Sequence, residues 1–231
     1  MKNRCLLLDF AGTIAHTKLS FEELLESFHK MIAKELNLDI EKVKEAENNL
    51  SELGNDLFSP QARVKISSIE KEYKIHEKWY SSILQQLKIE NNKLVKKLID
   101  YRMNGIEYIL YNDTFEALKN LYEKFNIITL TNGLPSRINE INNLGIKKYL
   151  NNIYISSIIG YEKPSKEAFT IVLEKNQLDS KKVVFVDDKD KNLKAAKELG
   201  FRVIQMNRGT VSNTSTEFEQ ISSLMELQKV L

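Results

Sequence analysis

The chain has 231 residues, of which 42% are hydrophobic and 29% are charged, the balance of an ordinary globular protein. Lys and Arg total 34 against 32 Asp and Glu, so the net charge of +2 gives no reason to expect a nucleic-acid partner. No apolar run approaches the ~20 residues of a membrane span, and the single cysteine, Cys5, excludes intrachain disulfides and thiolate metal clusters. We therefore expect a cytoplasmic protein, monomeric or homodimeric, that binds neither nucleic acid nor membranes.

The first half of the chain predicts one strand followed by helices. Residues 3–9 contain the continuous apolar run Cys5-Leu6-Leu7-Leu8, which is typical of a strand buried on both faces. Ser20 and Glu23 have the spacing of a capping box, and apolar residues then recur three or four apart. The same spacing predicts helices near 40–52, 60–72, 76–88 and 90–103, and no strand is expected between about 15 and 104.

After Gly105, strand-like and helical segments alternate. Strands are expected at 127–130, 153–155, 183–186 and 202–206, and helices near 114–124, 135–144 and 165–176 and up to about 199. Beyond about 212 no motif is clear. This alternation predicts an α/β fold, in which a parallel sheet is covered by helices on both faces and an all-α segment is inserted.

Four polar clusters follow the predicted strands: Asp9, Thr131, Lys163 after a loop, and the pair Asp187-Asp188. Each cluster alone is compatible with a simple helix cap. Because ligands of an open parallel sheet bind at the carboxyl ends of its strands, the clusters together predict one site at one sheet edge.

In order and spacing, these clusters resemble the four sequence motifs of the haloacid dehalogenase superfamily. The motifs are Leu7-Leu8-Asp9-Phe10-Ala11-Gly12-Thr13, Leu130-Thr131-Asn132-Gly133, Gly160-Tyr161-Glu162-Lys163-Pro164, and Phe185-Val186-Asp187-Asp188 followed by Asn192. The resemblance implies a Rossmann-like, doubly wound parallel sheet formed by residues 1–15 and 105–231. It also implies a helical cap of the family's first type at 16–104.

The resemblance further implies a Mg²⁺-dependent hydrolase, expected to be a phosphatase for a small phosphorylated metabolite. Asp9 would attack phosphorus and form an aspartyl phosphate. Asp9, Asp188 and the backbone carbonyl of Ala11 would bind the metal, because hard oxygen ligands suit Mg²⁺. Asp187 would anchor the site lysine or share the metal. Asn192 would either support the metal ligands or make a local helix-turn hydrogen bond.

The phosphoryl group would be held by the second and third motifs. Thr131 and the amides near Asn132 would donate hydrogen bonds to the phosphoryl oxygens. Lys163 would neutralise those oxygens and keep Asp9 ionised.

Ala11 departs from the usual family pattern Asp-x-Asp-Gly-Thr, in which the second acid protonates the leaving oxygen. General acid–base help of this kind is worth about 10²–10⁴-fold in rate. Three interpretations stay open. The leaving group needs no proton, as in an acyl or aryl phosphate. Another side chain donates it, with His16 as the candidate. Or the protein binds phosphate-like ligands or a partner and turns over little.

Two other family activities remain alternatives. Asp-x-Ala-Gly-Thr is also the pattern of phosphonoacetaldehyde hydrolase, which uses a cap lysine, although this chain has no counterpart to that enzyme's lysine motif. A dehalogenase is less favoured, because dehalogenases carry an aromatic residue at the position of Ala11 and need no metal. The cap lysines are Lys65, Lys71, Lys74 and Lys78.

Residues of the cap are expected to choose the substrate. His29 and His76 are interpreted as structural. The candidates to line the cleft are Gly54, Phe58, Trp79 and Tyr80.

Overall fold

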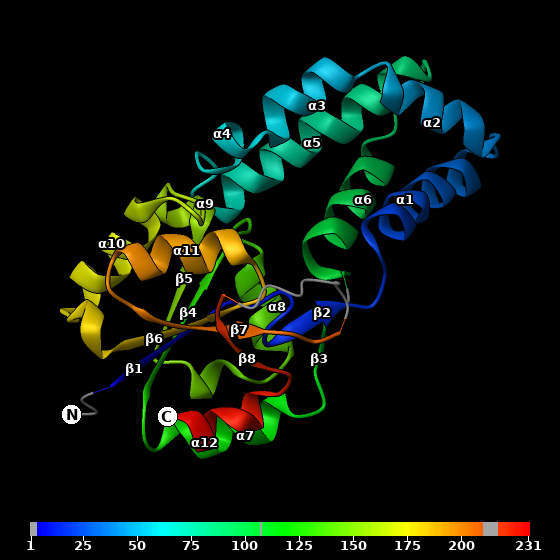
Figure 1. Cartoon of the computed structure of the whole chain (residues 1–231). Helices are drawn as coiled ribbons and strands as arrows, with labels where there is room; N and C mark the ends of the chain where they lie inside the picture. The colour runs from blue at the N-terminus through cyan, green and yellow to red at the C-terminus, as the bar shows by residue number, and fades with distance from the viewer. Residues whose placement is uncertain (1–3, 107, 210–216) are drawn as a thin grey trace.

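The computed structural model describes residues 4–106, 108–209 and 217–231. Within these ranges the core is a six-stranded parallel sheet of order β5-β4-β1-β6-β7-β8 (Figure 1). The order reverses at β1, and ligands bind outside the carboxyl ends of the strands at such a switch point. The strands are β1 Cys5–Leu8, β4 Asn126–Thr131, β5 Asn152–Ile155, β6 Val183–Asp187, β7 Arg202–Met206 and β8 Glu219–Ile221.

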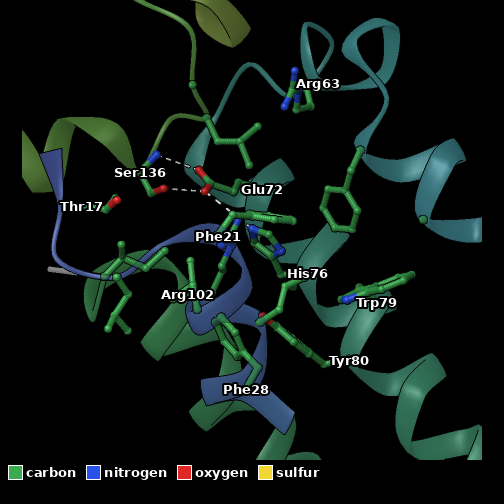
Figure 2. A pocket seen from close by; sticks show the side chains of 18 of the residues that line it. Thr17, Phe21, Phe28, Arg63, Glu72, His76, Trp79, Tyr80, Arg102 and Ser136 are labelled. Carbon is green, nitrogen blue, oxygen red and sulfur yellow. Dashed lines mark hydrogen bonds and ion pairs between the residues drawn. The ribbon is translucent and has the colours of Figure 1, made fainter. Parts of the chain in front are cut away.

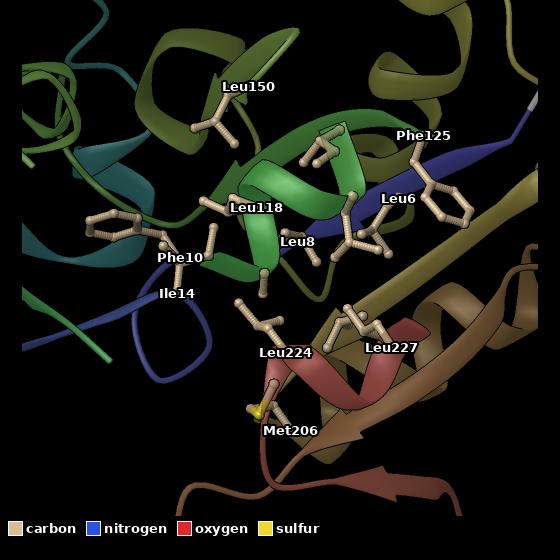
Figure 3. Close-up of a cluster of buried hydrophobic side chains, with 14 of the residues drawn as sticks. Leu6, Leu8, Phe10, Ile14, Leu118, Phe125, Leu150, Met206, Leu224 and Leu227 are labelled. Atoms are coloured by element: carbon tan, nitrogen blue, oxygen red, sulfur yellow. The ribbon is translucent and has the colours of Figure 1, made fainter. Parts of the chain in front are cut away.

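β1 is apolar throughout because both of its faces are covered. Leu6 and Leu8 pack with Leu118 in one cluster (Figure 3), whereas Leu7 packs with Phe169 in another. Successive side chains of a strand point to opposite faces, so an unbroken apolar run is what a doubly covered strand requires. The same burial fixes β1 in the middle of the sheet, where its end can meet the ends of two neighbours.

Helices cover both faces of the sheet and confirm the predicted fold class. α7, α8 and α12 contribute to the cluster of Leu6 and Leu8, and α10 and α11 to that of Leu7. The core helices are α7 Thr114–Tyr122, α8 Arg137–Asn143, α9 Ser156–Ile159, α10 Lys166–Asn176, α11 Asp190–Glu198 and α12 Leu227–Val230, with 3₁₀ turns η1 Lys147–Tyr149, η2 Ser180–Lys182 and η3 Leu224–Glu226. No helix in the described ranges is long and apolar enough to cross a membrane.

A helical cap stands over the core (Figure 1). It has a hydrophobic cluster of its own, in which the rings of Phe28 and Tyr80 stack with centroids 5.6 Å apart. β2 (Ala15–Thr17) and β3 (Tyr108–Leu110) pair antiparallel where the chain enters and leaves the cap. The cap helices are α1 Phe21–Leu36, α2 Ile40–Asn48, α3 Ser51–Phe58, α4 Pro60–Arg63, α5 Ile69–Gln86 and α6 Asn92–Asn104.

The structure corrects four expectations about the elements. Instead of helices at 60–72 and 76–88, the chain forms the short α4 and one long α5, because the Ser68 hydroxyl caps α5 by accepting a hydrogen bond from the amide of Lys71 (3.2 Å). β2 lies where no strand is expected, since three residues are too few to show alternation and the pairing with β3 defines it. The single helix expected near 40–52 is instead α2, which ends at Asn48, followed by α3, which begins at Ser51. β8 and α12 lie beyond about 212, where the sequence shows no clear motif. Residues 3 and 210–216 lie outside the described ranges.

Candidate active site

Asp9 directly follows β1 and is 6% exposed. A tight turn comes next, in which the carbonyl of Phe10 accepts hydrogen bonds from the amides of Ile14 and Ala15, both at 2.9 Å. Gly12 in this turn has a φ of +92°, a conformation that residues with a Cβ avoid. A Cβ at Gly12 would lie 2.6 Å from Oδ2 of Asp188. The turn therefore brings the loop after β1 into close contact with the acid that follows β6.

Lys163 joins the ends of two neighbouring strands. Its Nζ donates hydrogen bonds to Oδ1 of Asp9 (2.5 Å) and to Oδ2 of Asp187 (2.7 Å), and all three side chains are buried. Burial by itself lowers the pKa of Lys163, but the charges of Asp187 and Asp9 outweigh it and the pKa is raised. The lysine is therefore a fixed cation at the carboxyl edge of the sheet.

Asp187 has its oxygens occupied by partners. Besides Lys163, it accepts hydrogen bonds from the amide of Lys189 (2.8 Å) and from Nδ2 of Asn192, which lies 3.0 Å from each carboxylate oxygen. Asp187 thus contacts the lysine that it is expected to anchor. Asn192 in turn orients Asp187.

The acids at this edge fit a divalent cation. Oxygens of Asp9, Asp187 and Asp188 lie within 4.8 Å of one another, and Oδ1 of Asp188 is buried with no hydrogen-bond partner in the described part of the chain. Burial and the charges of Asp9 and Asp187 raise the pKa of Asp188 to about 7. Of these three carboxylates, Asp9 and Asp187 pair with Lys163, whereas Asp188 forms no ion pair with any described residue, so the group carries excess negative charge when all three are ionised. A doubly charged ion would balance that charge.

Thr131 and Asn132 lie at the end of β4, and Thr131 is buried. The side chain of Asn132 is already engaged with the third motif. Its Nδ2 donates to the carbonyl of Lys163 and its Oδ1 accepts from the amide of Lys163, both at 2.9 Å. The backbone of Asn132 therefore remains for a ligand, while its side chain holds the Lys163 loop in place. Sequence analysis missed this second role.

A cavity of about 710 Å³ lies between the cap and the core (Figure 2). Its core side includes Asn132, Gly133 and Arg137. The structure places His29 and His76 in its wall as well, although they were expected to be structural. The four predicted cleft residues, Gly54, Phe58, Trp79 and Tyr80, all line it.

Arg137 is a site residue that sequence analysis did not single out. Its guanidinium lies over the rings of Tyr108 (4.4 Å to the centroid) and Phe10 (5.1 Å), and it pairs with Glu140 at 2.5 Å. Burial lowers its pKa, but Tyr108, Glu140 and, more weakly, Asp9 outweigh burial and raise it. The sequence signal that could have identified Arg137 is its position, five residues after Asn132 on the same loop-to-helix connection.

Polar contacts bind the cap to the core, among them a hydrogen bond of 3.0 Å from Nδ2 of Asn139 to Oδ1 of Asn104. Glu72 of α5, fully buried, accepts hydrogen bonds from the amide (2.7 Å) and hydroxyl (2.6 Å) of Ser136. Arg63 of α4 pairs with Glu162 at 3.2 Å. The spacing of Glu72, His76 and Tyr80, each four residues apart, could have shown that they share one buried face of α5.

His16, the candidate replacement proton donor, and the candidate Schiff-base lysines have different surroundings. The ring of His16, on β2, packs 4.9 Å from that of Tyr111, and its Nδ1 lies 3.0 Å from the carbonyl of Thr17. The catalytic role of His16 stays a prediction. Exposed positions are unsuited to a Schiff-base lysine, which needs desolvation. The exposed cap lysines, outside the cavity wall described above, are Lys65, Lys71, Lys74 and Lys78.

Comparison with known proteins agrees with this fold. Residues 4–200 match the family model described as haloacid dehalogenase-like hydrolase. The chain is 25% identical to enolase-phosphatase E1 of Aquifex aeolicus, over 97% of this chain and 99% of that protein. Among solved structures, it resembles 2-haloacid dehalogenase from Pseudomonas syringae (TM-score 0.73, 15% identity, 98% and 97% coverage). It also resembles the magnesium-bound HAD-hydrolase YfnB of Bacillus subtilis (TM-score 0.60, 18% identity, 100% and 99% coverage).

Proposed function

This chain belongs to the haloacid dehalogenase-like hydrolase family, and from that premise we propose that it is a Mg²⁺-dependent phosphatase for a small phosphorylated metabolite. The observation that carries the proposal is the buried group in which Lys163 binds Asp9 and Asp187 while Oδ1 of Asp188 lacks a partner among the described residues. Enolase-phosphatase E1, the relative that matches 97% of this chain, is named a phosphatase. YfnB, a protein of similar fold, is bound to magnesium.

Asp9, Asp188 and the backbone carbonyl of Ala11 are the groups that would hold Mg²⁺. Asp187 is excluded from the set we propose, because Lys163, Lys189 and Asn192 already take up its oxygens. Bound there, the metal would offset negative charge on the phosphoryl oxygens.

Residues of the protein carry out the other steps of the proposed reaction. Asp9 attacks phosphorus, a bond forms between its carboxylate oxygen and phosphorus, and the bond from phosphorus to the leaving oxygen breaks. Burial raises the pKa of Asp9, and the charge of Lys163 opposes that rise and favours the ionised nucleophile. Lys163 also attracts the phosphoryl oxygens. Thr131 and the amides around Asn132 donate hydrogen bonds to those oxygens. Water then cleaves the aspartyl phosphate and releases phosphate.

Ala11 limits which substrates react well. With no carboxyl group at this position, the leaving oxygen must depart without a proton from residue 11. Acyl and aryl phosphates meet that condition because their leaving anions are stable. Alkyl phosphates should react more slowly by about 10²–10⁴-fold, the usual worth of general acid–base help.

The test is a screen of the purified protein, with Mg²⁺ and with a chelator, against aryl, acyl, sugar and other alkyl phosphates. Asp9→Asn should abolish turnover, because an amide is a poor nucleophile. Asp56→Asn is the matched control, since Asp56 is an exposed carboxylate outside the cavity wall. Ala11→Asp should raise alkyl phosphatase activity much more than aryl phosphatase activity.

The competing function is a family member that binds phosphate ligands or a protein partner and turns over little, a possibility that rests on the missing acid at Ala11. Failure to hydrolyse any of these phosphates would favour it. Activity that persists in Asp9→Asn would overturn our assignment of the nucleophile, and activity unaffected by the chelator would overturn the metal requirement.

A further inference from the structure

We propose that the leaving group of the substrate is a mostly apolar, ring-sized body bearing a carboxylate, which Arg102 and His76 bind inside the cavity. This inference rests on the proposed phosphatase function, because it describes what the cavity accepts when a phosphoryl group lies at Asp9. Both side chains come from the cap and belong to the cavity wall (Figure 2).

Arg102 differs from the other arginines of the cavity wall. Arg63 pairs with Glu162 at 3.2 Å and Arg137 pairs with Glu140 at 2.5 Å. Arg102, in the last turn of α6, makes no hydrogen bond or ion pair with any residue in the described ranges. Burial raises the pKa of Glu140, and the charges of Arg137 and Arg102 oppose that rise, but no carboxylate in the described ranges pairs with the Arg102 guanidinium directly. A partly buried guanidinium without a direct partner loses hydration and gains no hydrogen bond in return. Its donors are therefore available to a ligand.

His76 offers a second donor close by. It is 2% exposed, and its Nε2 has no hydrogen-bond partner within the part of the chain described. The nearest carboxylate oxygen, on Glu72, is 3.8 Å from Nε2, too far for a hydrogen bond, and Ser136 already donates two hydrogen bonds to Glu72. Burial, the largest cause, lowers the pKa of His76, and the charge of Arg102 adds to this effect, which Glu72 only partly opposes. A neutral ring with its proton on Nε2 can donate to a ligand carboxylate.

The rest of the cavity wall favours a flat apolar body. The ring of Phe58 stacks on His76 (5.6 Å, 25°) and meets Trp79 edge-on (5.6 Å, 88°). Phe21, also in the wall, is 63% exposed and adds apolar aromatic surface to the cavity. Aromatic walls bind ring-containing groups through offset or edge-to-face contacts.

The cavity borders the loop after β4, which also belongs to the proposed phosphoryl site. Asn132 and Gly133 belong to the cavity wall, and the side chain of Asn132 holds the backbone of Lys163. A phosphate ester at Asp9 would therefore direct its leaving group into the cavity. An aryl or acyl leaving group also meets the requirement that Ala11 imposes, since it departs without a proton donor.

The experiment compares kcat/KM for para-carboxyphenyl phosphate, phenyl phosphate and para-(hydroxymethyl)phenyl phosphate. We expect the carboxylated ester to be preferred about tenfold to a hundredfold over both neutral esters, the range expected when a charged hydrogen-bonded pair forms. Arg102→Met should bring that ratio close to one, and Arg102→Lys should restore part of it. Lys96→Met is the matched control, because it removes an exposed cation from the same helix and should leave the ratio unchanged.

A binding measurement separates the two proposals. The non-hydrolysable para-carboxybenzylphosphonate should bind at least tenfold more tightly than benzylphosphonate, measured by calorimetry with Mg²⁺ present. If no ester is hydrolysed but the carboxylated phosphonate still binds more tightly, the phosphatase function fails and the carboxylate site stands. If phenyl phosphate is hydrolysed and neither rate nor binding favours the carboxylate, the carboxylate site is overturned. The same conclusion follows if Arg102→Met lowers stability and leaves both ratios unchanged, because Arg102 would then only balance nearby glutamates.

Discussion

Replacing Gly12 by alanine tests the contact between the first and fourth motifs. The φ of Gly12 is +92°, and a Cβ there would lie 2.6 Å from Oδ2 and 2.8 Å from Cγ of Asp188. Forcing a residue with a Cβ into this backbone region costs about 1–3 kcal/mol. Relieving the overlap with Asp188 adds about 1–3 kcal/mol, the usual cost of overpacking. We expect Gly12→Ala to lower the free energy of unfolding by about 2–6 kcal/mol.

The overlap also predicts a functional loss. An ordinary carbon–oxygen contact is roughly 3.4 Å, so Asp188 must move by roughly 0.8 Å, far more than the ~0.2 Å tolerance of a metal–ligand distance. Misplacement by about 1 Å can cost about 10² in rate. Gly12→Ala should therefore weaken Mg²⁺ binding and lower kcat/KM for aryl phosphates by about that factor.

Gly160→Ala is the matched control. Gly160 has a φ of +85°, and nothing lies within 4 Å of the Cβ that it would gain. Gly160→Ala should lower the free energy of unfolding only by the backbone cost of about 1–3 kcal/mol. The assays are urea unfolding followed by circular dichroism, calorimetric titration with Mg²⁺, and kinetics. Equal losses of stability in the two variants, with Mg²⁺ affinity retained in Gly12→Ala, would refute the argument that Gly12 makes room for Asp188.

Three further predictions concern buried or partly buried charges. Lys163→Met should lower the free energy of unfolding by about 3–5 kcal/mol without Mg²⁺, because it leaves buried carboxylates without their cation; a loss below about 1 kcal/mol in urea unfolding would contradict this. Partial burial raises the pKa of Asp113, but its hydrogen bonds, first of all from Arg208, outweigh burial and hold the pKa below its usual value. The stabilisation it gives should thus be complete above the unfolded-state pKa of about 3.9 and disappear as the pH falls through the folded value. The stability difference between wild type and Asp113→Asn across pH measures this, and a difference that persists unchanged below that range would contradict it. A double-mutant cycle of Glu72→Gln and Ser136→Ala should give a coupling energy of about 0.5–3 kcal/mol, and a value near zero would mean that this contact does not hold the cap.

Much of the core could be predicted because its elements carry strong local patterns. β1 and β6 are short apolar runs buried on both faces, and β4 and β7 are mostly apolar and buried towards their carboxyl ends; such runs are visible in the sequence alone. The boundaries in the cap were less predictable. α5 runs without a break through residues where two helices were expected, because apolar spacing marks a buried face and does not mark where one helix ends.

The sequence by itself determined the family resemblance, the α/β class and the polar residues that end the strands, because motif spacing and strand burial are local properties of the chain. Only the tertiary structure decided how those residues share their contacts. Asp187 and Asn132 hold Lys163, whereas Arg102 and Nε2 of His76 have no hydrogen-bond partner in the described ranges. Each of these facts depends on distances between segments far apart in the chain, and no local pattern encodes such distances.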